Sequence, residues 1–154
     1  MVDVTILKHH RFFLSFSDEQ MGVLAERLEP ANAEAGAAIF REAQAGDDAL
    51  YIIISGSVKI TKKGKTGESV LALLKDGEFF GEMSMIFPAP RSAGAVAIAN
   101  CSMLKLRGND YKLIKSEKPD IAVRLNEIFL KVLIQRLRDA DEKLAEGGGG
   151  IGAL

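Results

Sequence analysis

The sequence contains a single cysteine, Cys101, so it cannot form an internal disulfide. Cys101 stands in a strand-like run, which predicts a buried thiol in a protein of a reducing compartment. Long apolar runs are also missing: none approaches the roughly 20 residues that a helix needs to span a bilayer, and the N-terminus lacks the pattern of a secretory signal. We therefore expect a soluble, cytoplasmic protein without a membrane segment.

A charge excess of one sign is absent as well. Lys and Arg together number 20 and Asp and Glu 21, which gives a net charge of −1 with acids and bases interspersed. Such a surface does not favour nucleic acid or another polyanion as a partner. His9 and His10 are the two histidines, and no Cys or carboxylate lies close to them in sequence, so we predict a solvated polar face and no metal site.

The length of 154 residues suits one domain with a single core. Its middle consists of short apolar segments separated by Gly, Asp, Asn and Ser, which is typical of short antiparallel strands. The segments are 39–40, 50–54, 58–61, 69–74, 95–98 and 103–106. We predict a mainly β fold, an antiparallel, jelly-roll-like double-stranded β-helix (β-roll) over residues 37–107, with flanking helices.

An N-terminal helical segment is predicted over residues 1–36. Its first part mixes apolar anchors with a basic patch, which indicates a short helix and a turn that dock on the roll. A longer helix follows, because Ser17 and Gln20 have the spacing of a capping box before an apolar run of helical period. Pro30 marks the end of that helix.

Residues 108–146 are predicted to form two C-terminal helices. Asn109 can cap the first, and Pro119 at a first-turn position begins the second, which runs to about Glu146. The long helix carries two adjacent apolar stripes, so we expect it to pack on the roll and on a second partner; one broad core-facing stripe in a monomer is the alternative. The stripes are Ile121, Leu125, Ile128 and Val132, and Phe129, Leu133, Leu137 and Leu144. Residues 147–154 begin with four glycines and are predicted to be a loose tail.

A lone carboxylate and a lone arginine lie in the otherwise apolar stretch 80–93. Charges are costly there unless they meet each other or a charged ligand, so Glu82 and Arg91 indicate a small anion site. Gly81 lets a ligand approach the backbone, and a helical turn over 83–87 would present free N–H groups to it. Arg91 can grip two phosphate oxygens and Glu82 can accept hydrogen bonds from sugar hydroxyls, which implies a ligand with phosphate and ribose. An ion pair that braces a loop is the alternative.

The pattern Phe80-Gly81-Glu82, a short helical insert, and then Pro90-Arg91-Ser92-Ala93 resembles the phosphate-binding cassette of the cyclic-nucleotide-binding domain family. That family includes the catabolite activator protein and the regulatory subunits of cyclic-AMP-dependent protein kinase. The resemblance covers roughly residues 17–146, and Ala43 stands where a glycine is usual. It implies that Arg91 holds the cyclic phosphate, that Glu82 binds the ribose 2′-hydroxyl, and that the long helix covers the base near Arg136 and carries a dimer contact. The candidate ligand-binding residues are Phe80, Gly81, Glu82, Met83, Ser84, Arg91, Ser92, Ala93, Ala72 and Arg136.

The implied function is a non-catalytic, regulatory sensor domain that binds cAMP or cGMP and signals through its C-terminal helix to an unknown effector protein. Ser92 is compatible with either base. We expect a homodimer without further cofactor and without a DNA-binding domain, since a helix-turn-helix would need a further helical unit. One alternative is a degenerate structural or dimerisation module of the same fold. Another is an enzyme on a cupin-like roll, which would need metal-binding histidines inside the barrel, whereas His9 and His10 precede it.

Overall fold

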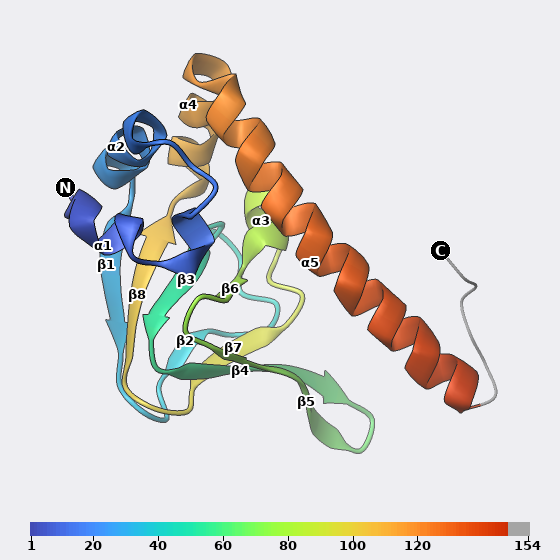
Figure 1. Cartoon of the computed structure of the whole chain (residues 1–154). Helices are drawn as coiled ribbons and strands as arrows, with labels where there is room; N and C mark the ends of the chain where they lie inside the picture. The colour runs from blue at the N-terminus through green and yellow to red at the C-terminus, as the bar shows by residue number, and fades with distance from the viewer. Residues whose placement is uncertain (148–154) are drawn as a thin grey trace.

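The computed structural model describes residues 1–147. Two four-stranded antiparallel sheets form a roll, with short helices at one end and a long helix along one side (Figure 1). The first sheet has the strand order β1-β8-β3-β6 and the second β2-β7-β4-β5. This architecture confirms the predicted fold class. The strands are β1 (Glu29–Ala33), β2 (Ala38–Phe40), β3 (Leu50–Ser55), β4 (Ser57–Gly64), β5 (Gly67–Lys75), β6 (Phe79–Phe80), β7 (Gly94–Ala97) and β8 (Cys101–Leu106). The helices are α1 (Val4–Lys8), η1 (Arg11–Phe13), α2 (Asp18–Arg27), α3 (Glu82–Ile86), α4 (Gly108–Glu117) and α5 (Pro119–Glu146).

Strand β3 is buried on both faces, which explains its continuous apolar sequence. Leu50 and Ile52 belong to a core between the roll and the helices. Tyr51 and Ile53 belong to the core inside the roll, because successive side chains of a strand point to opposite faces. The same alternation separates the two phenylalanines of β6: Phe79 joins the helical core and Phe80 the roll interior.

The N-terminal segment contains the predicted helices and one strand that the sequence did not predict. The capping box of α2 is present, with the Gln20 amide N–H donating to Ser17 Oγ at 3.1 Å and the Ser17 N–H donating to Gln20 Oε1 at 2.9 Å. Strand β1 begins at Glu29, directly after α2, and pairs with β8. Its sequence contains Pro30 and no β-branched residue, so it does not predict a strand. Strand β1 lies at the edge of the sheet, where proline is tolerated because the outer side of the strand makes no hydrogen bonds to a neighbouring strand.

The C-terminal helices begin where the sequence predicted but are capped differently. Pro119 occupies the first turn of α5, as predicted. Asn109 does not cap α4: the cap position is Arg107, which makes no side-chain capping bond. The Gly108 N–H instead donates to Asp48 Oδ1 at 3.4 Å. Of the predicted loose tail, residues 148–154 lie outside the described part of the chain.

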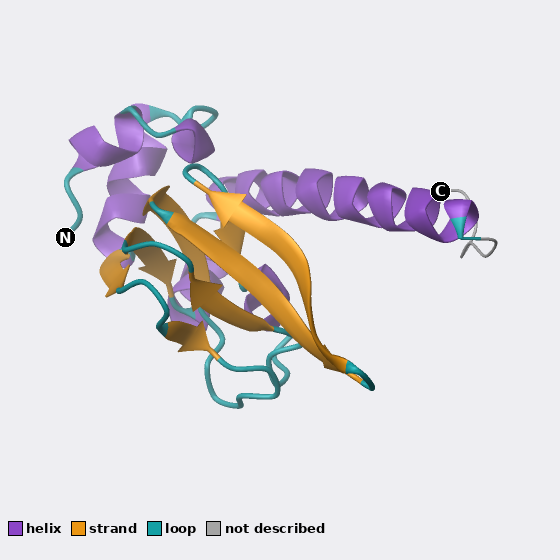
Figure 2. Ribbon diagram, turned by 90° about the horizontal axis from the view of Figure 1, so that it is seen from below, coloured by secondary structure: helices purple, strands orange, loops and turns teal. Residues whose placement is uncertain are grey.

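Helix α5 packs on the roll with its N-terminal half, while its C-terminal half extends beyond the sheets (Figures 1 and 2). The first predicted stripe does face the roll, and Phe129 is buried with it and not in the second stripe. A separate apolar stripe stays exposed along the helix. It consists of Val123, Leu130, Ile134, Leu137 and Leu144. No helix within residues 1–147 is long and apolar enough to cross a membrane.

His10 fixes the N-terminal segment to the first sheet. Its Nε2 lies 3.0 Å from the carbonyl oxygen of Ile53, and its Nδ1 lies 3.4 Å from the amide nitrogen of Phe12. Both contacts are hydrogen bonds only when Nε2 carries the proton and Nδ1 is an acceptor. Burial lowers the pKa of His10 below its ordinary value of 6.5; Arg11 lowers it further, while the Ile53 carbonyl and Asp76 oppose the shift.

Acidification is therefore expected to destabilise the docked N-terminal segment. Because the folded pKa of His10 is depressed, its contribution to stability is complete above pH 6.5 and is lost as the pH falls from there through the folded pKa. Chemical denaturation between pH 8 and 5 should show a steeper loss in the free energy of unfolding for the parent than for His10→Gln. His9→Gln, at the exposed neighbour, is the matched control and should follow the parent. Equal pH profiles for the parent and His10→Gln would contradict this role.

Candidate functional site

A small cavity of about 80 Å³ lies where α3, the chain around Arg91, and α5 meet. It brings together every sequence-predicted site residue except Ala72. Its lining is Phe40, Phe80, Gly81, Glu82, Met83, Ser84, Arg91, Ser92, Ala93 and Arg136. Ala72 does not line it; this residue lies on β5 opposite Ile60 and packs against the core of the roll.

Arg91 is held in place by several partners and is only 3% exposed. Its Nη2 lies 2.8 Å from Asp47 Oδ1 and also donates to the Ala49 carbonyl at 2.8 Å, and its Nη1 donates to the Gly81 carbonyl at 3.1 Å. The guanidinium also stacks over the Phe40 ring, 4.0 Å from the centroid. Its Nε makes no hydrogen bond within residues 1–147. The orientation of Arg91 is thus fixed without a ligand.

Position 81 requires a glycine, because of its backbone conformation and of the atoms packed against it. Its φ is +87°, a conformation that side chains rarely adopt, and an added Cβ would lie 2.6 Å from the Ala49 carbonyl and 2.9 Å from Arg91 Nη1. The glycine therefore makes room for the Arg91 side chain and the Ala49 carbonyl. It also precedes α3, the predicted helical turn, and provides no side-chain cap to the start of that helix.

Asp47 and Phe40 contact Arg91 and were not identified as site residues from the sequence. Asp47 lies in a Gly-Asp-Asp turn and supplies the negative partner of Arg91, and its Oδ1 also accepts the Ala49 N–H at 3.3 Å. The loop before it contains Ala43, whose φ of 67° is the one positive value outside glycine among the described residues. The Ala43 N–H donates to the Arg91 carbonyl at 2.7 Å, so the unusual alanine directly contacts the cassette.

Glu82 is 2% exposed and is paired with α5 instead of Arg91. Arg136 Nη1 donates to Glu82 Oε1 at 3.2 Å, and Arg136 Nη2 donates to the Phe79 carbonyl at 3.4 Å. Burial raises the pKa of Glu82 above its ordinary value of 4.5, and Arg136 and Arg91 oppose that shift. Among the described residues Glu82 and Arg91 form no ion pair with each other, so the loop-bracing pair considered from the sequence is not present.

The buried charge of Glu82 is expected to reduce the stability of the ligand-free protein. Because the pKa of Glu82 is raised in the folded state, the contribution of its protonated form to stability is complete below pH 4.5. This contribution is lost as the pH rises through the pKa of Glu82 in the folded protein. Glu82→Gln should therefore raise the free energy of unfolding at neutral pH, because it removes the cost of burying the charge while Arg136, 39% exposed, keeps its contact with water. This gain should shrink toward acid pH. Denaturant melts with the exposed Glu127→Gln as the control would test it, and a Glu82→Gln variant less stable than the parent would refute it.

Comparison with known proteins connects this geometry to a family. Residues 30–115 match the family model for the cyclic nucleotide-binding domain. The chain is 31% identical over 142 residues to the CRP-like cAMP-activated global transcriptional regulator of Mycobacterium tuberculosis, covering 92% of this chain and 61% of that protein. It is 37% identical over 128 residues to the cyclic AMP receptor protein of Thermus thermophilus, covering 82% and 55%. The chain therefore spans little more than half the length of these curated relatives.

Solved structures agree with the sequence relatives. The crystal structure of a cyclic nucleotide-binding domain from Methylobacillus flagellatus superposes with a TM-score of 0.80 at 25% identity, covering 98% of this chain and 84% of that one. The Thermus thermophilus catabolite activator protein superposes with a TM-score of 0.73 at 32% identity, covering 93% and 63%. The match over the roll and its cassette is thus present in sequence and in backbone. The chain belongs to the cyclic nucleotide-binding domain family.

Proposed function

We propose that this chain binds cAMP or cGMP in the cavity between Glu82 and Arg91 and acts as a regulatory sensor. The observation that carries the proposal is a carboxylate and a guanidinium, 2% and 3% exposed, that line one cavity without pairing with each other. Arg91 is suited to the cyclic phosphate, because a planar guanidinium binds two oxygens at once. Glu82 is suited to the ribose, because a carboxylate accepts hydrogen bonds from hydroxyls.

Ligand binding requires this cavity to open. Its volume of about 80 Å³ is well below the roughly 300–1,000 Å³ of small-molecule sites. Two contacts of the closed arrangement compete with a nucleotide: Asp47 shares the Arg91 guanidinium, and Arg136 shares the Glu82 carboxylate. We infer that a ligand would take over part of each. A ligand that replaces the contact between Glu82 and Arg136 would bind with different affinities when α5 is close to Glu82 and when it is displaced. Such a difference in affinity is required for a signal to pass through α5.

We further propose that α5 pairs with α5 of a second copy. Val123, Leu130, Leu137 and Leu144 recur every seven residues, and all four are exposed apolar side chains. A repeat of seven is the period of a coiled-coil seam.

The structural module without a ligand is the second candidate. It is favoured by one observation: Asp47 and two backbone carbonyls already satisfy Arg91. A degenerate site could keep the arginine for those contacts alone. As for the cupin-like enzyme, the described residues contain no group of three or more His, Cys, Asp and Glu side chains that could hold a metal ion.

Calorimetry with cAMP and cGMP side by side distinguishes the two candidates. The sensor proposal expects saturable heat with at least one of them, and the ratio of the two dissociation constants gives the base preference. A noncyclic control, AMP, should bind more weakly, because the proposed partner of Arg91 is a cyclic phosphodiester. Absence of heat from both cyclic nucleotides, with a folded protein, would support the structural module and overturn the sensor proposal.

A further inference from the structure

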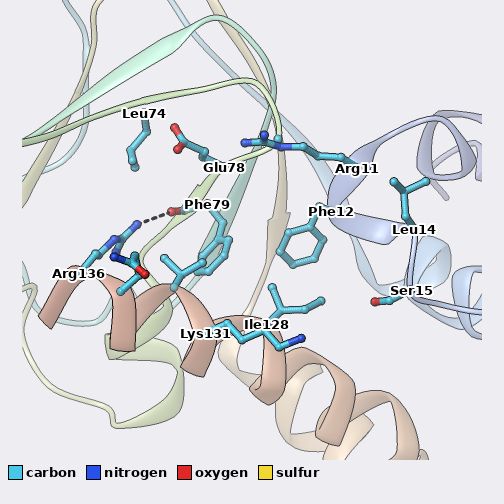
Figure 3. Close-up of a pocket in the computed structure, with 13 residues that line it drawn as sticks. Arg11, Phe12, Leu14, Ser15, Leu74, Glu78, Phe79, Ile128, Lys131 and Arg136 are labelled. Atoms are coloured by element: carbon cyan, nitrogen blue, oxygen red, sulfur yellow. Dashed lines mark hydrogen bonds between the residues drawn. The ribbon is translucent and has the colours of Figure 1, made fainter. Parts of the chain in front are cut away.

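A second and larger cavity lies between η1, the turn that joins β5 to β6, and α5 (Figure 3). Its volume is about 610 Å³, inside the roughly 300–1,000 Å³ that is usual for small-molecule sites. Within residues 1–147, Arg136 alone lines both this cavity and the Glu82–Arg91 cavity. The apolar walls are formed by Phe12, Leu74, Phe79, Ile128 and Val132.

The charged groups around this cavity are mainly positive. Arg11, Lys131 and Arg136 line it together with one acid, Glu78. Arg136 is paired with Glu82, and Glu78 Oε2 accepts the Lys75 N–H at 2.8 Å. Arg11 and Lys131 take part in no ion pair within residues 1–147. Two cations without an acidic partner therefore border an apolar space.

Arg11 is held at the cavity by the local backbone. Its side chain lies against Gly77, where an added Cβ would overlap the Arg11 Nε. The residue before it, His10, is bonded to the Ile53 carbonyl and contacts the Phe12 N–H, so η1 is fixed on the sheet. Figure 3 shows the Arg11 side chain reaching from η1 to the turn that carries Glu78, with Phe12 beside it. The Arg11 guanidinium and the Phe12 ring thus border the same cavity.

We propose that this cavity binds a small amphipathic carboxylic acid. Its apolar body would lie between Phe12, Phe79 and the Ile128 side of α5, and its carboxylate would be bound by Arg11. A guanidinium fork matches the two oxygens of a carboxylate, and Lys131 adds positive potential from α5. The charge complementarity selects this occupant over a neutral or cationic one. This site is distinct from the cyclic-nucleotide cavity, so its occupancy does not depend on the proposed sensor function.

Three ligands with the same alkyl chain test the headgroup requirement. Calorimetric titration of the full chain with decanoate, decanol and decyltrimethylammonium, with decanol below its solubility limit and the two ions below their micellar concentrations, should give saturable binding of decanoate. We expect decanoate to bind at least about tenfold more tightly than decanol, as a charge-assisted hydrogen bond predicts. Decyltrimethylammonium should bind most weakly. Equal affinities for the three ligands would overturn the proposal.

Substitutions then test the position of the site. Arg11→Gln should weaken decanoate binding by about tenfold while leaving decanol unchanged, because only the charged contact is lost. The matched control is Arg124→Gln, at an exposed arginine of α5 outside the cavity, which should bind decanoate as the parent does. Lys131→Gln, at an exposed position of α5, should show a smaller loss. Unchanged decanoate binding in both Arg11→Gln and Lys131→Gln would mean adsorption elsewhere and would refute the site.

Two further measurements separate this cavity from its alternatives. Decanoate should still bind when Arg91 is replaced by lysine, so failure of the cyclic-nucleotide site and failure of this site are distinguishable. If a second copy of the chain filled the cavity, decanoate affinity would fall as the protein concentration rises through dimer formation. That result would overturn the proposal, whereas an affinity independent of protein concentration supports it.

Discussion

Replacing Arg91 with alanine is expected to weaken cyclic-nucleotide binding by about 2–5 kcal/mol, the range for truncating one partner of a buried charge pair. At about 1.4 kcal/mol per factor of ten, this is a loss of at least thirtyfold. The reason is that the phosphate would enter a buried site without its main cationic partner. Calorimetry measures the change in dissociation constant, and the exposed Arg124→Ala is the matched control. Parent-like affinity in the Arg91 variant would remove Arg91 as the phosphate anchor.

The same substitution should also destabilise the fold, which the sequence alone did not indicate. A cassette at a surface pocket would tolerate alanine, but Arg91 is buried and bonded to Asp47, Ala49 and Gly81. Leaving a buried group unsatisfied costs about 1–3 kcal/mol. Arg91→Lys separates the two effects, because lysine keeps the charge beside Asp47 but loses the planar fork. We expect Arg91→Lys to retain more stability than alanine and still to bind ligand poorly.

Replacing Leu137 and Leu144 with glutamate is expected to convert a dimer to a monomer. Both side chains are exposed in the single chain, at 38% and 45%, and both belong to the seven-residue repeat of exposed apolar residues on α5. In a pair of helices they would be buried at the seam, where two added carboxylates per chain oppose association. The dissociation constant of the dimer should rise at least about a thousandfold, given hot-spot energies of about 2 kcal/mol or more for each position.

Sedimentation equilibrium measures this shift. The matched control is Arg138→Glu, which adds the same side chain at an exposed position of α5 outside the apolar stripe. Both variants should keep the circular dichroism of the parent, because these residues contribute nothing to the core of the roll. A parent that stays monomeric at all accessible concentrations would refute the dimer and leave the apolar stripe for another partner.

The sequence predicted most of the fold because its signals are local. The apolar runs at β3 and β5, the capping box of α2 and Pro119 each specify an element within a few residues. The exceptions are elements stabilised by distant partners. Strand β1 depends on β8, and β6 consists of two residues that pair with β3. Nothing within either short segment distinguishes it from a loop.

In the candidate site, too, local sequence signals were identified and contacts between distant residues were not. The sequence identified Glu82 and Arg91 because isolated charges stand out in an apolar stretch. It could not identify their partners, since Asp47 precedes Arg91 by more than forty residues and Arg136 follows Glu82 by more than fifty. Ala72, a candidate from the resemblance, does not line this cavity but packs against the core of the roll, so its role in ligand binding stays a prediction. Partner choice depends on tertiary packing, which a single sequence does not specify.

The two phenylalanines of β6 connect the candidate site to helix α5. Phe80 packs on Phe40, with ring centroids 5.8 Å apart, and the Arg91 guanidinium stacks over the Phe40 ring. Phe79 packs on Phe129 of α5, with ring centroids 5.3 Å apart. The two residues are neighbours in β6 with side chains on opposite faces, so a rotation of this strand as a unit would move both rings. We therefore expect a displacement of the cassette that rotates β6 to change the packing of Phe79 on α5 directly.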